Sequence, residues 1–115
     1  MVNVYDTANQ LQEDLRKTQE FAALKEAFEE LKKDEEAFNA FQDLRRAQME
    51  LQKREEAGTL GDIKPEEAKA MHEKGQKAAG YDAVKKLMEK ERALSTTMDE
   101  INKIIFTPIT ELYES

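Results

Sequence analysis

The feature that most constrains the fold is a long apolar repeat in the C-terminal third of the chain. Its positions alternate in steps of three and four, and they are Val84, Leu87, Glu91, Leu94, Met98, Ile101 and Ile105. This spacing, sustained for three heptads, predicts a helix from Asp82 to about Phe106 that packs lengthwise against a near-parallel partner. At 1.5 Å per residue the helix is roughly 37 Å long. A compact chain of about 100 residues has a radius of gyration near 13 Å, so we expect part of this seam to contact a second subunit. All seven residues are therefore candidates for an oligomer interface.

The first half of the sequence repeats the same spacing in three shorter segments. Polar capping residues precede each of them, namely Asn3, Thr18 and Asp34. The apolar stripes are Val4, Ala8, Leu11 and Leu15, then Phe21, Leu24, Phe28 and Leu31, then Phe38, Phe41, Leu44, Gln48 and Leu51. We predict three helices, of which the second closes at Lys32 and Lys33. The third runs to about Ala57, where Gly58 supplies a left-handed cap.

The clearest loop lies between Gly58 and Pro65, and Pro65 is suited to the first turn of a fourth, weaker helix. Gly75 lowers the stability of that helix and Gly80 bends or ends it. Thr107 and Pro108 predict a cap and a first position for a short terminal helix. The predicted fold is all-α, a single domain of residues 1–115. It is an antiparallel bundle of about five to six helices built around one long C-terminal helix.

The charge of the chain argues against a general affinity for nucleic acid. The net charge is −7, and DNA phosphates repel an acidic surface. One stretch is locally basic, with Lys74, Lys77, Lys85, Lys86, Lys90 and Arg92. We interpret it as a solvated face. The alternative is a contact with RNA or with an acidic protein.

No combination of residues predicts catalysis or a bound metal. The chain has one histidine and no cysteine, which excludes thiolate ligands and a cysteine nucleophile. His72 and Glu73 are not followed by the second histidine of a zinc protease motif, because position 76 is Gln. The pair Glu-x-x-His of di-iron bundles also fails, because position 69 is Lys. We therefore expect no enzymatic activity and no cofactor.

Glu91 is the one charged residue on the long apolar seam. A carboxylate there lowers stability unless it is paired or exposed to water. We expect it at a subunit edge or paired with a base such as Arg45 or Arg46. The functional alternative is a charge that sets register or selects a partner.

The sequence offers no membrane span and no secretion signal. Residues Met1 to Asp6 include no basic leader or apolar core, and no segment approaches the roughly 18 apolar residues of a transmembrane helix. The absence of cysteine suits a reducing compartment. We expect a cytoplasmic protein that does not enter a membrane.

The sequence resembles the YlbF/YmcA family of small bacterial helical proteins, and most closely its YheA-like branch, over nearly the whole chain. The residues that carry the resemblance are Val4-Tyr-Asp-Thr-Ala-Asn-Gln-Leu11, the pair Phe38 and Phe41, and Ile101-Asn-Lys-Ile-Ile-Phe-Thr-Pro-Ile-Thr-Glu-Leu112. The resemblance implies an all-helical fold around a long helix, dimers or larger oligomers, and no enzymatic activity. Some members act as regulatory partners in competence, sporulation, biofilm formation and RNA processing. Related complexes hold iron–sulfur clusters through cysteines, which this chain lacks.

These observations favour a homo-oligomeric adaptor or regulatory subunit that binds its own copy and a further, unidentified protein. The runner-up is an RNA-associated factor that uses the stretch from Lys74 to Arg92. A third hypothesis, a small-ligand-binding bundle, requires an apolar pocket between helices.

Overall fold

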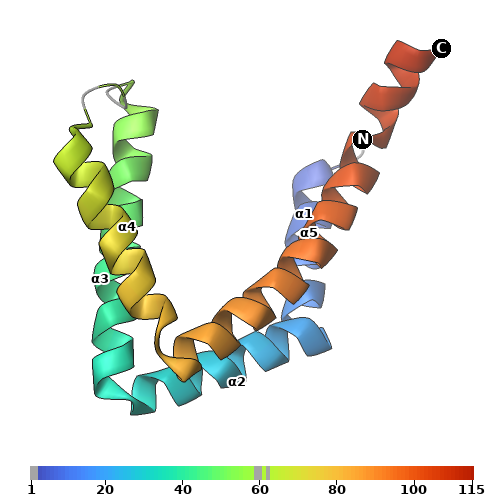
Figure 1. Cartoon of the computed structure of the whole chain (residues 1–115). Coiled ribbons are helices and arrows are strands. Elements are labelled where there is room, and N and C mark those ends of the chain that lie inside the picture. Colours follow the sequence, from blue (N-terminus) through green and yellow to red (C-terminus); the bar gives the residue numbers. More distant parts are fainter. Residues whose placement is uncertain (1–2, 59–60, 62) are drawn as a thin grey trace. The chain divides into compact units, whose positions relative to one another are not determined.

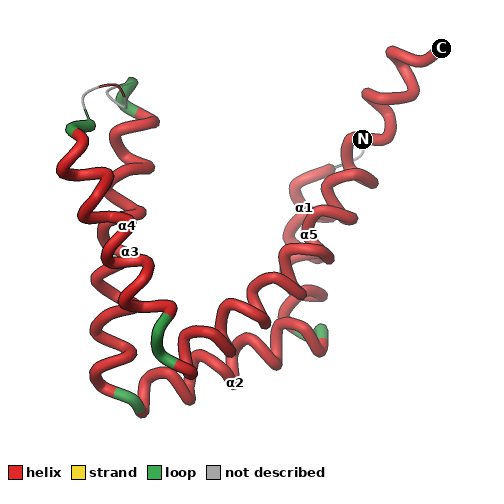
Figure 2. Tube along the Cα trace, in the orientation of Figure 1, coloured by secondary structure: helices red, strands yellow, loops and turns green. Residues whose placement is uncertain are grey.

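The computed structural model describes residues 3–58, 61 and 63–115, and nearly all of them are helical (Figures 1 and 2). Five helices follow one another along this part of the chain. They are α1 (Val4–Arg16), α2 (Gln19–Lys33), α3 (Glu35–Glu56), α4 (Pro65–Ala79) and α5 (Asp82–Glu114). The described residues contain no strand. The prediction of an all-α fold is confirmed.

The helices begin where the polar caps predict. Each cap side chain accepts hydrogen bonds from backbone N–H groups of the first turn. Asn3 accepts from Tyr5 at 3.0 Å and Asp6 at 3.3 Å, Thr18 from Phe21 at 3.2 Å, and Asp34 from Ala37 at 3.2 Å. These bonds satisfy donors that have no partner inside the helix.

Glycine and proline set the ends of the middle helices. Gly58 follows the C-cap of α3 and has a φ of +75°, the left-handed conformation that glycine adopts at least cost. Pro65 is the first residue of α4, where its missing N–H leaves no bond unmade. Gly80 is the C-cap of α4 and keeps a right-handed conformation. Of the two possibilities for Gly80, it therefore ends the helix.

The predicted short terminal helix is wrong, because α5 continues through Pro108 to Glu114. Proline's fixed φ near −65° is compatible with a helix, and its cost arises from the lost N–H and from crowding of the preceding turn. Pro108 leaves the carbonyl of Ile104 without its usual donor. The Thr107 hydroxyl does not cap a new helix but donates to the Lys103 carbonyl at 2.9 Å.

The chain divides into two compact units. We call Ala27–Leu87 the hairpin unit, and Met1–Glu26 together with Met88–Ser115 the terminal unit. The helices α2 and α5 each contribute to both. The prediction of a single domain stays a prediction.

The hairpin unit contains all the buried residues among those described. Its core is formed by Ala27, Leu31, Ala37, Ala40, Leu44, Ala78, Val84 and Leu87, which come from four helices. In this unit α3 and α4 pack side by side and run antiparallel (Figure 1). Phe28 of α2 contacts Phe38 and Phe41 of α3 edge-on, with ring centroids 6.1 and 6.4 Å apart. The aromatic pair singled out in the sequence therefore joins α3 to α2.

The terminal unit has no buried residue in its described part. Leu11 and Leu15 of α1, and Leu94 and Ile101 of α5, are half-buried. Val4 and Ala8, at the start of the stripe on α1, are exposed.

Candidate protein–protein interface

The predicted seam on α5 begins inside the core. Val84 and Leu87 belong to the hairpin unit and are 0% and 1% exposed. Neither has surface left to offer a partner. The candidate interface is therefore restricted to the part of α5 that follows.

Beyond Met88, α5 carries several exposed apolar residues. Met98 is 37% exposed, Ile105 57%, Ile109 51% and Leu112 70%. Successive residues of an α-helix are rotated by about 100°, so these four lie within roughly 60° of one another around the helix axis. We call them the open face of α5.

Two aromatic residues flank the open face on one side. Phe106 and Tyr113 are exposed and lie within about 80° of Met98 around the axis. Ile104 is also exposed but lies on a different side, about 100° from its neighbour Ile105. The open face and its aromatic border thus occupy adjoining sectors of α5, with Asn102 between them.

Glu91 lies on the same side of α5 as Met98 and is exposed. Its carboxylate therefore meets water in this chain, and the cost of burying an unpaired charge is not incurred. Of the remaining predicted seam residues, Leu94 and Ile101 are half-buried.

Sequence reasoning missed Ile109 and Leu112 as members of this face. The alternating spacing continues from Ile105 by three residues to Pro108 and by four to Leu112. The repeat is visible in the sequence, but the expectation of a new helix at Pro108 ends the predicted seam at Ile105.

The basic stretch is distributed over two helices and both units. Lys74 and Lys77 lie on α4, Lys85 and Lys86 on the first turns of α5, and Lys90 and Arg92 in the terminal unit. Two of the six bases already have carboxylate partners. Lys74 Nζ lies 3.7 Å from Asp43 Oδ1, and Lys86 Nζ lies 3.1 Å from Glu30 Oε2. The stretch is therefore partly neutralised within the hairpin unit.

The described part of the chain contains no metal-binding cluster. His72 is exposed on α4, and no group of three or more His, Asp or Glu residues in the described part of the chain is arranged to hold a metal ion. None of the helices in residues 3–58, 61 and 63–115 is long and apolar enough to cross a membrane.

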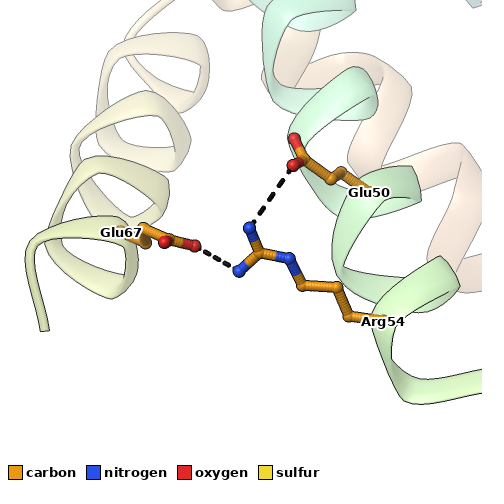
Figure 3. A network of polar contacts seen from close by, with 3 residues as sticks. All are labelled: Glu50, Arg54 and Glu67. Atoms are coloured by element: carbon orange, nitrogen blue, oxygen red, sulfur yellow. Dashed lines mark hydrogen bonds and ion pairs between the residues drawn. The ribbon is translucent and has the colours of Figure 1, made fainter. Parts of the chain in front are cut away.

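The helices α3 and α4 are also joined by charged side chains. An ion-pair network links these helices near their connecting loop (Figure 3). Arg54 of α3 binds Glu67 of α4 across the gap, and its other terminal nitrogen lies 3.6 Å from Glu50 on its own helix. Arg54 therefore links the C-terminal end of α3 to the N-terminal end of α4.

The chain is similar to known proteins over almost its full length. A family model described as control of competence regulator ComK, YlbF/YmcA, matches residues 4–110. A UPF0342 protein from Lacticaseibacillus paracasei is 45% identical over 114 residues, which cover 99% of this chain and 98% of that protein. A UPF0342 protein from Ligilactobacillus salivarius is 44% identical, covering 99% and 97%.

Two solved structures have the same fold. One is a protein of unknown function (DUF964) from Bacillus stearothermophilus, 28% identical with a TM-score of 0.79, covering 97% of this chain and 96% of that one. The other is yheA from Bacillus subtilis, 30% identical with a TM-score of 0.70, covering 97% and 100%. The resemblance drawn from the sequence is confirmed.

Proposed function

Because the chain belongs to the YlbF/YmcA family, we propose that it is a non-enzymatic regulatory protein that binds other protein chains, first of all a second copy of itself. The observation that carries this proposal is the open face of α5. A regulatory role of the kind named in the family's description, control of a competence regulator, is the form of activity we propose.

The exposed apolar area is of the size that protein interfaces use. Burying one large aliphatic side chain removes on the order of 100 Å² from water. The open face with Phe106 and Tyr113 offers six partly exposed side chains, hence several hundred Å², on the scale of the ~800 Å² that each partner contributes to a standard interface. Exposed apolar patches of several hundred Å² are often functional.

A second copy is the simplest occupant, because an apolar helix face is complementary to itself. Two α5 helices in contact would bury Ile105, Ile109 and Leu112 of both chains with a two-fold axis between them. The six predicted apolar seam residues are then covered from two sources. Val84 and Leu87 are covered by their own chain, and the exposed part is covered by the partner. We place this complex in the cytoplasm.

RNA binding through Lys74 to Arg92 remains the alternative. The pairing of Lys74 with Asp43 and of Lys86 with Glu30 leaves fewer free cations for phosphates. A salt-sensitive shift of RNA that is lost in a Lys85→Glu, Lys86→Glu variant would support it. Absence of binding at low salt would end it.

The oligomer is tested by sedimentation equilibrium on the full chain. Ile105→Asp places a charge on the open face, and we expect it to weaken self-association at least tenfold. Ile104→Asp is the matched control, since it changes the neighbouring, equally apolar residue on another side of α5. Circular dichroism verifies that both variants stay helical. A wild-type chain that is monomeric at tens of micromolar, or two variants that weaken association equally, contradicts the proposal.

A further inference from the structure

Two hollows adjoin one another along α3 and α4 within the hairpin unit. The first has a volume of about 520 Å³ and is lined mainly by apolar side chains, among them Ala47, Leu51, Ile63, Ala68 and Met71. Leu51, Ile63 and Met71 are only half-buried, so each keeps apolar surface that a ligand could cover. Pockets that take small molecules have volumes of this order.

The second hollow has a volume of about 660 Å³ and is polar. It carries three cations, which are Arg46 of α3 and Lys74 and Lys77 of α4. Tyr81 and the amides of Asn39 and Gln42 add neutral donors. Two carboxylates, Glu36 and Asp43, also line it, so the hollow has a net positive charge on a chain whose net charge is −7.

Lys74 lines both hollows and therefore marks their junction. Its ion pair with Asp43 is long, at 3.7 Å, and both side chains are partly exposed. Such a pair contributes little to stability and exchanges partners at little cost. At the far end of the apolar hollow, Arg54 is held by Glu50 and Glu67 (Figure 3).

We infer that the two hollows together form a groove that binds a medium-chain carboxylate. Its alkyl chain lies against Leu51 and Met71, and its head group lies at Lys74. The apolar hollow favours binding of the ligand's alkyl chain, because each buried methylene increases the affinity roughly fourfold. The cations of the polar hollow complement the negative head group, and an ammonium ion forms charge-assisted hydrogen bonds with a carboxylate. A neutral alcohol of equal length lacks that second contribution.

The test follows the amide signals of the isotope-labelled full chain by NMR while small molecules are added. We expect octanoate to bind saturably and to shift signals of α3 and α4. Decanoate, with two more methylenes, should bind about fifteenfold tighter than octanoate. Octan-1-ol should bind at least fivefold more weakly than octanoate, and acetate not at all. Equal affinity for octanoate and octan-1-ol would overturn the head-group assignment. Shifts confined to α1 and the open face of α5, or no saturation, would overturn the site.

Three variants separate the two halves of the site. Ala68→Leu fills the apolar hollow and should weaken binding of octanoate and octan-1-ol alike. Lys74→Gln should weaken octanoate several-fold and leave octan-1-ol unchanged. Lys69→Gln, on the same helix but outside both hollows, is the charge-matched control and should change neither.

Equal losses for Lys69→Gln and Lys74→Gln would refute a specific head-group contact. Because none of these residues lies on the open face of α5, this inference and the proposed oligomer fail or succeed independently.

Discussion

The two units of this chain are both helical, but they differ in how far their apolar side chains are buried. All eight buried apolar residues of the described chain lie in the hairpin unit. Nine of its ten exposed large hydrophobic residues lie in the terminal unit, and Met49 is the exception. Amphipathic spacing is therefore common to both, whereas burial within the chain is not.

An apolar stripe on a helix therefore predicts that the helix packs against something. It does not predict whether the packing surface belongs to the same chain or to another one. In the hairpin unit four helices contribute to one core, and small residues such as Ala37, Ala40 and Ala78 let them approach closely. The terminal unit draws on α1 and on parts of α2 and α5. Its side chains remain half-buried at best, which is the state expected of a surface completed by another chain.

The largest difference between the two units is expected when one apolar side chain is truncated in each. Leu31→Ala removes a fully buried side chain and should lower the free energy of unfolding by about 3 kcal/mol. Leu112→Ala removes a largely exposed one and should change it by less than about 0.5 kcal/mol in the monomer. Urea unfolding at low protein concentration measures both. Similar losses for the two variants would show that the units do not differ in this way.

Pro108 allows a test of local helix stability inside the terminal unit. Pro108→Ala restores an N–H donor for the carbonyl of Ile104 and should stabilise the last turns of α5 by up to about 3 kcal/mol. Hydrogen exchange of the amides of residues 104–112 should slow accordingly, while exchange in α3 and α4 stays the same. Unchanged exchange near position 108 would mean that the proline costs this helix nothing.

Helix caps allow a matched test in both units. Asp34→Ala removes the cap of α3 in the hairpin unit and should lower the free energy of unfolding by about 1 kcal/mol. Asn3→Ala removes the cap of α1, whose stripe is half-buried or exposed, so it should fray that helix with little effect on global unfolding. Denaturant unfolding combined with hydrogen exchange separates the two effects. A larger global loss from Asn3→Ala would contradict the division.

The smallest effect is expected from a surface ion pair of the hairpin unit. Lys86 and Glu30 lie 3.1 Å apart, but about half of each side chain is exposed. A double-mutant cycle with Lys86→Ala and Glu30→Ala should give a coupling below about 0.5 kcal/mol. The coupling should fall further at 1 M salt, where the screening length is about 3 Å. A coupling above about 1 kcal/mol would assign this pair a larger part in joining α5 to α2.

Much of the fold could be predicted from local signals. Asn3, Thr18 and Asp34 cap helices because their short side chains reach backbone N–H groups within the same turn, and Gly58 adopts a conformation that other residues avoid. Pro108 misled the prediction for a local reason as well. A proline suits a first helical turn and costs about 3 kcal/mol inside a helix, so local chemistry favours a helix start at Pro108 over the continuous helix that forms.

The class of fold, the starts of the five helices and the existence of an apolar face along α5 follow from the sequence, because each depends on chemistry within a few residues. Which part of that face is buried in the core depends on how the helices pack. Val84 and Leu87 have the same spacing and chemistry as Ile105, yet the first two are buried and the third is not. The tertiary structure also decided that α3 and α4 leave two hollows that meet at Lys74. Burial and cavities depend on how distant helices pack, and periodicity along one helix carries no information about its neighbours.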